Sequence, residues 1–196
     1  WDQILPPPAV IGRTHYVTAV TQIDKRLVQI IDVEKIFAEI SPVNEDVSLE
    51  VKEKAKEIDI SNITILIADD SAVARNQVKR AMSAINVNTE TVNDGREALQ
   101  WLLEKAKKTD GPLFHKVPVI ISDIEMPEMD GYTLTAEIRN CEELRGIHII
   151  LHSSLSGVFN EAMVKKVGAD QFIAKFHPDE LLTAVQHWMT QISSSA

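Results

Sequence analysis

The stretch Ile63–Ser71, with the sequence ITILIADDS, decides the fold of this chain. Its apolar run, Ile63–Ala68, ends in two neighbouring carboxylates, Asp69 and Asp70. A short run that is almost uninterrupted in apolar residues is typical of a parallel strand that helices bury on both faces. The stretch therefore predicts a buried strand that carries two acidic side chains just beyond its carboxyl end.

Further apolar runs along the chain end in the same way, in a polar side chain. These are Val117–Ser122 (VPVIIS) before Asp123, Ile147–His152 (IHIILH) before Ser153, and Phe172–Ala174 (FIA) before Lys175. A weaker run, Thr89–Val92, is typical of an edge strand, and helical patterns lie between most of the runs. We therefore predict an α/β fold with a doubly wound, five-stranded parallel sheet. Because the carboxyl ends of such strands share one edge, these polar side chains should meet in one crevice.

The composition is that of a globular protein. Hydrophobic residues make up 44% and charged residues 25% of the 196 residues, and the formal net charge is −9. We expect no nucleic-acid partner, because proteins that bind phosphate backbones carry a basic stripe. No apolar run is long enough to cross a membrane and no signal peptide opens the sequence, so we expect a cytoplasmic protein without membrane insertion. The single cysteine, Cys141, excludes an intramolecular disulfide.

The first 42 residues have a different pattern. Tyr16–Thr21 and Leu27–Ile31 flank a polar turn at Gln22–Arg26, which predicts a β-hairpin, and a short helix over Val33–Ile40 should follow. Two strands and one helix cannot close a hydrophobic core by themselves. Since the sequence also begins at Trp1 without a methionine, we expect this segment to be the end of a larger domain. Its missing strands would come from an N-terminal part or from a second copy of the chain.

The segment that joins the two parts, residues 43–61, is highly charged. Its apolar residues Val47, Val51, Ala55 and Ile58 recur at helical spacing. This predicts an amphipathic linker helix, with a flexible coil as the competing interpretation. The predicted domains are therefore residues 1–42, a linker over 43–61, an α/β domain over 62–192 and a tail over 193–196.

The predicted crevice has a definite chemistry. Three clustered carboxylates, Asp69, Asp70 and Asp123, raise one another's pKa unless a cation lies among them. Oxygen ligands select a hard ion, and Mg²⁺ suits one or two carboxylates, a carbonyl and a phosphoryl oxygen. Asp123 can then attack phosphorus as a nucleophile, and the Lys175 ammonium and the Ser153 hydroxyl can hold the phosphoryl oxygens.

Each of these residues also has a purely structural interpretation. Asp70 can cap the helix that follows it, Ser153 can cap a strand end, and Lys175 can be solvated. The shared position favours the functional interpretation, because independent capping does not require all of them to lie at the same end of separate strands.

Four sequence features together resemble a two-component response-regulator receiver domain. They are ILIADDS at Ile65–Ser71, ISDIEMPEMDG at Ile121–Gly131, GADQFIAK at Gly168–Lys175, and Ser153 after its apolar strand. The resemblance covers residues 62 to 192 and implies the flavodoxin-like fold of receivers. It also implies a role for each matching position: Asp123 as phosphoacceptor, Asp70 as a direct magnesium ligand, Asp69 as a ligand largely through water, the backbone carbonyl of Glu125 as a third ligand, Ser153 as the switching hydroxyl, Lys175 as the phosphate-reading ammonium, and Phe172 as the rotating aromatic.

The N-terminal part has a second resemblance. Arg13–Phe37, RTHYVTAVTQIDKRLVQIIDVEKIF, is similar to the C-terminal end of a CheW-like coupling domain. A CheW-like module followed by a receiver is the arrangement of CheV-type chemotaxis proteins. This implies a phosphorylation-dependent signalling adaptor rather than an enzyme, with a chemotaxis histidine kinase as phosphodonor and the chemoreceptor array as partner. Whether the receiver adapts the array or drains phosphate from the kinase stays open.

Two positions depart from the receiver pattern, and two other functions fit the sequence less well. Phe176 follows Lys175 where receivers usually have a proline after a cis peptide bond, so the isomer of that bond is open, and Ser153 replaces the usual threonine. An aspartate-nucleophile phosphatase of the haloacid-dehalogenase type would use Glu125 as its acid, but its nucleophile follows the first strand and Asp123 follows the third. A transcriptional receiver would need a DNA-reading domain, and we do not expect one, because only Ser193, Ser194, Ser195 and Ala196 follow Ile192.

Overall fold

A computed structural model describes residues 17–31, 36, 48, 62–153, 158–175 and 177–194. The chain divides into two compact units, Trp1–Val43 and Asn44–Ala196, and each is described by itself. The helix predicted over Val33–Ile40 and the linker helix lie outside the described residues, except for Ile36 and Ser48. The predicted domain boundaries therefore stay predictions.

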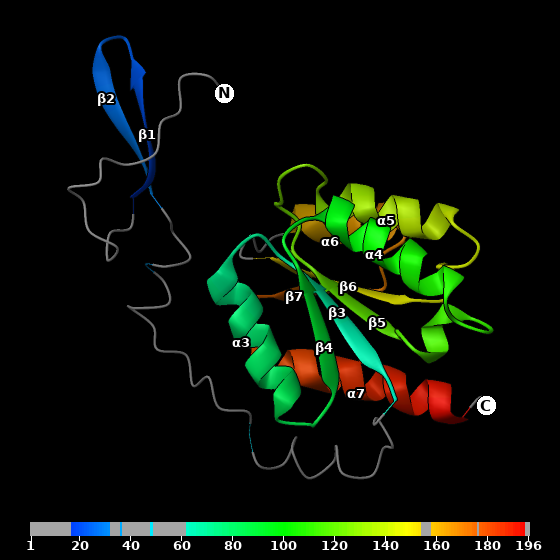
Figure 1. Cartoon of the computed structure of the whole chain (residues 1–196). Coiled ribbons are helices and arrows are strands. Elements are labelled where there is room, and N and C mark those ends of the chain that lie inside the picture. Colours follow the sequence, from blue (N-terminus) through cyan, green and yellow to red (C-terminus); the bar gives the residue numbers. More distant parts are fainter. Residues whose placement is uncertain are drawn as a thin grey trace. The chain divides into compact units, whose positions relative to one another are not determined.

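The second unit is built on a five-stranded parallel sheet, as the apolar runs predict (Figure 1). Its strands are β3 (Thr64–Ala68), β4 (Asn88–Val92), β5 (Val119–Ser122), β6 (His148–Ser153) and β7 (Gln171–Ala174), in the spatial order β4-β3-β5-β6-β7. The weak second strand is indeed an edge. Neighbouring strands pair so that Ala68 lies opposite Ser122, and Ser153 opposite Ala174. The carboxyl ends therefore form one edge, which brings the polar residues beyond them together.

Helices cover both faces of the sheet (Figure 1). They are α3 (Ala72–Ser83), α4 (Gly95–Lys107), α5 (Gly131–Asn140), α6 (Val158–Val167) and α7 (Pro178–Ser194), with a short 3-10 helix, η2, at Leu113–His115. One core cluster joins the sheet to α3 and α7, and a second joins it to α4, α5 and α6. Residues 65–68 are at most 1% exposed, so β3 is buried on both faces as its sequence predicts.

Local capping signals fix where the helices start. The side chains of Ser71, Asp94 and Asp130 each accept a hydrogen bond from a backbone N–H in the first turn of α3, α4 and α5. Helix α7 begins at Pro178, where a missing N–H costs nothing. Gly168 follows α6 with a φ of +84°, a conformation that glycine adopts without strain.

Several predicted boundaries move by one or two residues. Strand β5 begins at Val119 because Pro118 has no N–H to donate to a ladder. Ser153 is the last residue of β6 rather than the first residue after it, and α7 continues to Ser194, past the predicted end at 192. Within the described residues, no helix combines the length and the apolar character that crossing a membrane requires.

The first unit contains the predicted hairpin, with a shorter turn than predicted. Strands β1 (Val17–Ile23) and β2 (Arg26–Ile31) pair antiparallel, and only Asp24 and Lys25 form the turn. The prediction of a five-residue turn over Gln22–Arg26 was therefore wrong, because polar residues in an exposed ladder look like a turn. Both turn residues have positive φ, 49° and 63°, as in a two-residue turn that matches the twist of the strands. Leu27, Ile23 and Ile31 are 69%, 56% and 51% exposed.

Candidate phosphoacceptor site

The three predicted carboxylates converge at the carboxyl edge of the sheet. Asp69 and Asp70 follow β3 and Asp123 follows β5, and each offers an oxygen within 4.8 Å of the others. Asp69 and Asp123 are only 3% and 6% exposed, whereas Asp70 is exposed to solvent. The arrangement is an acidic crevice with two buried walls and one open side.

Hydrogen bonds hold Asp69 on three sides. Its backbone N–H donates to the carbonyl of Val92 at 3.3 Å, and its Oδ1 accepts from the N–H of Ser71 at 2.8 Å. The Arg75 guanidinium donates to the Asp69 carbonyl oxygen at 2.6 Å from the first turn of α3. Sequence reasoning missed Arg75, and its only signal was a cationic residue one turn into the helix that follows the acidic pair.

Two hydrogen bonds hold the backbone and the side chain of Asp123 in place. Its backbone N–H donates to Ala68 at 2.8 Å, and its Oδ1 accepts from the N–H of Ile124 at 2.8 Å. A side chain at Gly131 would place its Cβ 2.2 Å from the Asp123 carbonyl oxygen, so only glycine fits there. The start of α5 therefore rests directly on the backbone of the candidate acceptor.

Lys175 joins the two buried carboxylates. Its Nζ lies 3.0 Å from Asp69 Oδ2 and 3.1 Å from Asp123 Oδ2, and its side chain is 2% exposed. Burial raises the pKa of Asp123 from 3.8 to about 7; Lys175 opposes this rise and Asp69 adds to it. Three carboxylates face this one described ammonium, so the crevice keeps a residual negative charge when all three are ionised. The donor set, three carboxylates with a residual negative charge, fits a hard divalent cation such as Mg²⁺.

The remaining predicted residues surround this centre. Ser153 is 1% exposed at the end of β6, and its carbonyl accepts from the N–H of Lys175 at 3.0 Å. Phe172 lies on β7 opposite Leu151 and packs, half-buried, against the core under α4, α5 and α6. Glu125 is exposed in the loop after the acceptor. The structure therefore brings Asp69, Asp70, Asp123 and Lys175 together, and the individual roles of all the predicted residues stay predictions.

A buried histidine next to this centre was not predicted as part of it. His152 precedes Ser153 on β6 and is 6% exposed. Burial, followed by the charges of Lys175 and His177, lowers its pKa from 6.5 to about 3. His152 is therefore neutral at physiological pH. The sequence showed a histidine in a strand, but not the lysine that would lie near it.

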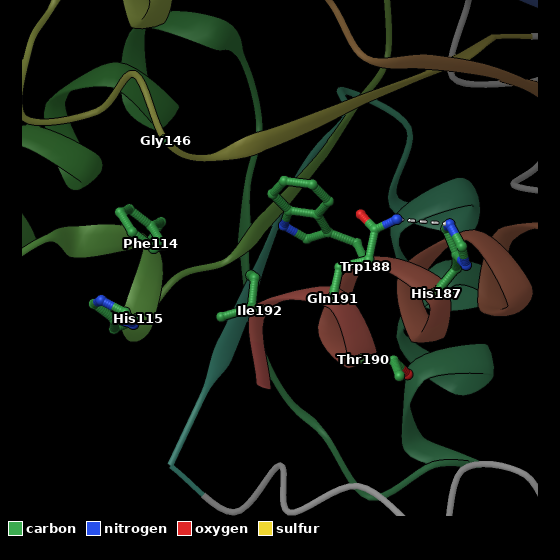
Figure 2. A pocket seen from close by; sticks show the side chains of 8 residues that line it. All are labelled: Phe114, His115, Gly146, His187, Trp188, Thr190, Gln191 and Ile192. Atoms are coloured by element: carbon green, nitrogen blue, oxygen red, sulfur yellow. Dashed lines mark hydrogen bonds between the residues drawn. The ribbon is translucent and has the colours of Figure 1, made fainter. Parts of the chain in front are cut away.

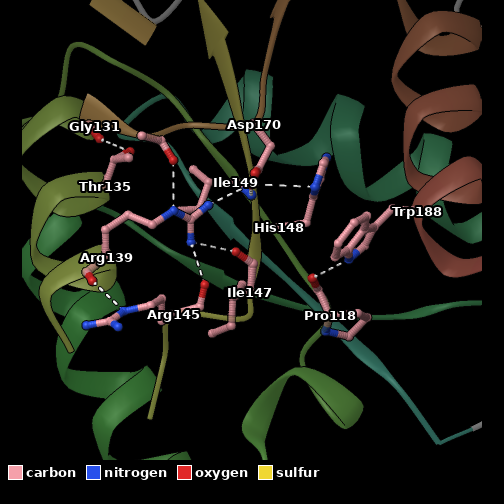
Figure 3. Close-up of polar contacts among 11 residues, drawn as sticks. Pro118, Gly131, Thr135, Arg139, Arg145, Ile147, His148, Ile149, Asp170 and Trp188 are labelled. Carbon is pink, nitrogen blue, oxygen red and sulfur yellow. Dashed lines mark hydrogen bonds and ion pairs between the residues drawn. The ribbon is translucent and has the colours of Figure 1, made fainter. Parts of the chain in front are cut away.

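The opposite, amino end of the sheet carries a dense polar network (Figure 3). Arg139 donates to the carbonyls of Gly168 and Ile147 at 2.7 and 2.8 Å and to Asp170 Oδ2 at 2.6 Å. The same Asp170 oxygen accepts from the N–H of Ile149 at 2.7 Å. This network ties α5 to the starts of β6 and β7.

A pocket of about 860 Å³ also lies at the amino end (Figure 2). Trp188 forms part of its wall, stacks on His148 with ring centroids 4.5 Å apart, and donates its indole N–H to the Pro118 carbonyl at 3.2 Å. The other lining residues are Phe114, His115, Gly146, His187, Thr190, Gln191 and Ile192. None of the described residues that line this pocket carries a carboxylate, so despite its size it does not offer the oxygen ligands of the acidic crevice.

Comparison with known proteins agrees with the geometry of the acidic crevice. The response regulator receiver domain family matches residues 65–186. The chain belongs to this family. Chemotaxis protein CheY4 of Vibrio cholerae is 30% identical in sequence, and its structure superimposes with a TM-score of 0.54 over 64% of this chain and 97% of its own. The predicted flavodoxin-like receiver fold is thereby confirmed.

The similarity to CheV proteins extends beyond the receiver. Chemotaxis protein CheV1 of Helicobacter pylori is 29% identical over 180 residues, which are 92% of this chain and 52% of CheV1. CheV3 of the same organism is 31% identical over 166 residues, 84% of this chain and 52% of CheV3. The predicted resemblance to CheV-type chemotaxis proteins is confirmed. The chain spans about half the length of these relatives.

Proposed function

We propose that this chain is a phosphorylation-dependent signalling adaptor of bacterial chemotaxis, with Asp123 as phosphoacceptor. The observation that carries the proposal is the buried Asp123 carboxylate, held between the Lys175 ammonium and a second carboxylate at the open edge of a receiver sheet. An Asp123 oxygen would form a bond to phosphorus while the bond between phosphorus and the donor's histidine nitrogen breaks. The donor would be the phosphohistidine of a chemotaxis kinase.

Asp69, Asp70 and Asp123 would hold Mg²⁺, together with the backbone carbonyl of Glu125. The ion would neutralise the crowded oxygens of donor and acceptor. Lys175 already lies at hydrogen-bonding distance from Asp123, so its ammonium is in place to bind a phosphoryl oxygen after transfer. His152, which is buried and neutral, adds no charge that would compete with Lys175 for that oxygen.

Ser153 and Phe172 would carry the signal out of the site. Ser153 would turn its hydroxyl toward the phosphoryl group, and Phe172 would move into the space that this vacates. The linker has one described contact with this region: the N–H of Ser48 donates to Asp179 Oδ1 at 3.0 Å, in the first turn of α7. Asp179 and Phe172 both line a groove between β7 and α7. A rearrangement at Phe172 would therefore alter the hydrogen bond between Ser48 and Asp179.

The first test is phosphorylation of the Asp123→Asn variant by acetyl phosphate with Mg²⁺, followed by intact-mass spectrometry. We expect at least a hundredfold slower labelling, because the amide oxygen is a far weaker nucleophile. Asp110→Asn, which removes a carboxylate from the other end of the sheet, is the matched control and should label normally. A phosphate gained by Asp123→Asn at the wild-type rate would overturn the assignment.

The second test addresses the adaptor role and uses hydrogen exchange with and without beryllofluoride. We expect altered protection around Asp123 and also on the Phe172 face and in residues 1–62. A response confined to the acidic crevice would contradict the proposed coupling. Comparing phosphotransfer rates with those of the pathway's other receivers would then separate adaptation of the array from a phosphate sink.

The hairpin supports a further part of the proposal, that the first unit docks on other strands. Leu27, Ile23 and Ile31 are exposed apolar side chains on a two-stranded ladder with open edges. The strands would be those of a CheW-like domain in a longer cytoplasmic protein, or those of a second copy of this chain. Light scattering of the 196-residue chain tests the second source. A monomer whose hairpin is cut rapidly by protease would favour the first.

A further inference from the structure

A basic recess of about 360 Å³ lies far from the acidic crevice, between the start of β3, the end of α4 and the segment that precedes β5. It is lined by Asn62, Thr64, Lys105, Lys108, Thr109, Asp110 and Lys116. The N–H of Thr64 donates to the Lys116 carbonyl at 2.8 Å, which fixes two of its walls to each other. Its volume suits a small ligand.

The recess concentrates positive charge in a chain whose net charge is −9. Three lysines and one aspartate line it. In the described part of the chain no carboxylate forms an ion pair with Lys105, Lys108 or Lys116. Lys105 has only a loose partner, the Trp101 ring, with 5.6 Å between its Nζ and the ring centroid. The three ammonium groups are therefore available to an anion.

Stabilisation of a helix end explains only part of this cluster. Lysines in the last turn of a helix interact favourably with its dipole, and Lys105 and Lys107 are in the last turn of α4. Lys107, however, does not line the recess, whereas Lys116 does and comes from the segment after η2. The dipole of α4 therefore does not explain why lysines from two separate segments line the same recess.

We propose that this recess binds a small anion that carries at least two phosphate charges. Ammonium groups act as point charges for phosphate oxygens, and the Asn62 amide adds a neutral donor. Cations that surround a compact volume favour a compact, multivalent anion over an extended acidic peptide. The recess is also too small to follow a nucleic-acid backbone, which agrees with the absence of a basic stripe. The site is independent of phosphoryl transfer, because it lies at the other ends of β3 and β5.

The probe is sodium pyrophosphate, titrated into the ¹⁵N-labelled 196-residue chain without Mg²⁺ and at constant ionic strength. We expect saturable amide shifts at Thr64, Thr109 and Lys116. The triple variant Lys105→Gln, Lys108→Gln, Lys116→Gln should weaken binding at least tenfold, and Asp110→Asn should tighten it twofold to threefold. The matched control changes three exposed lysines of α3 and α6, as Lys79→Gln, Lys165→Gln, Lys166→Gln, and should keep the wild-type affinity.

Each contrary outcome overturns the proposal. Equal weakening in both triple variants would show attraction by overall charge without a site. Amide shifts that do not saturate, or that occur only around Asp69 and Asp123, would show that pyrophosphate does not bind in the recess. Binding of hexaglutamate without binding of pyrophosphate would assign the recess to an acidic peptide instead. All six lysines are exposed, so a thermal melt should show that both triple variants are folded.

Discussion

The two ends of the receiver sheet balance charge in different ways. At the amino end, the Asp170 carboxylate accepts from Arg139 and from the N–H of Ile149, while Arg139 also satisfies the carbonyls of Ile147 and Gly168. At the carboxyl end, the single ammonium of Lys175 is shared by Asp69 and Asp123, and the pKa of Asp123 stays raised. The balanced end ties α5 to the starts of β6 and β7, whereas the unbalanced end is the one that we propose to bind a cation and a phosphoryl group.

The largest expected effect is a gain in stability from Asp123→Asn in the absence of Mg²⁺. A pKa raised from 3.8 to about 7 means that ionised Asp123 costs the folded state about 4 kcal/mol at neutral pH. The folded state holds the proton between these pH values and the unfolded state does not. The stability difference between variant and wild type should therefore grow from pH 4 to pH 7 and stay constant above. Urea unfolding measures this difference. A variant less stable than the wild type at pH 7.5 would contradict the inference that ionised Asp123 destabilises the folded state.

Arg139→Met should have the opposite sign. The variant keeps the apolar stem but removes the Arg139 donor from the Ile147 carbonyl and from the Asp170 carboxylate, which keeps only its bond from the N–H of Ile149 among the hydrogen bonds described above, so we expect a loss of about 2 to 3 kcal/mol. Arg96→Met is the control, because its ion pair with Glu128 is exposed and 3.8 Å long, and it should cost less than about 0.5 kcal/mol. Equal effects of the two variants would show that the amino end is not a special structural network.

His152→Leu tests the buried charge at the carboxyl end of the sheet through the loss of folding stability at low pH. The folded pKa of His152, about 3, lies below the ordinary 6.5, so the unfolded state binds the proton first and stability is lost as pH falls below 6.5. Moving from pH 6.5 to pH 5, this group should cost about 2 kcal/mol. The leucine variant should lack that loss, and Asp123→Asn should show it most clearly, because the opposing slope of Asp123 is gone. Parallel curves for His152→Leu and wild type would contradict the buried, neutral state.

The smallest expected effect concerns backbone strain in the loop that follows Asp123. Glu128 has a φ of +59° in the loop between Asp123 and α5. Glu128→Gly should stabilise the protein by about 0.5 to 1 kcal/mol, because glycine adopts this conformation without a Cβ clash. Glu128→Ala removes the same exposed ion pair with Arg96 but keeps the Cβ, so it should give no gain. If both variants behaved alike, strain would not be the cause.

Much of the fold and of the crevice could be predicted because both depend on position along the chain. Apolar runs mark buried parallel strands, and the polar residue at each carboxyl end identifies Asp69, Asp123 and Lys175 without any contact being known. The strand ends were off by a few residues where a local feature decides, such as Pro118 at β5.

What could not be predicted depends on tertiary neighbours. Arg75 binds a backbone carbonyl, which has no side-chain signature in the sequence. His152 is neutral chiefly because the fold buries it, and Lys175, just past the neighbouring strand, lowers its pKa as well. The hairpin turn was placed wrongly because Gln22 and Arg26 are polar, although the ladder pairs both of them. In an exposed two-stranded ladder, polarity does not separate turn from strand.

The glycine at position 131 makes the support of Asp123 mechanically stiff. The acceptor follows a central strand that is paired on both sides, and the backbone of α5 rests on its carbonyl oxygen. Strand β7, in contrast, is paired along one side only in the described part of the chain. If Asp123 is the phosphoacceptor, as we propose, a group added to it would meet a fixed support on the α5 side, and we expect the displacement to pass toward β7, where Phe172 lies.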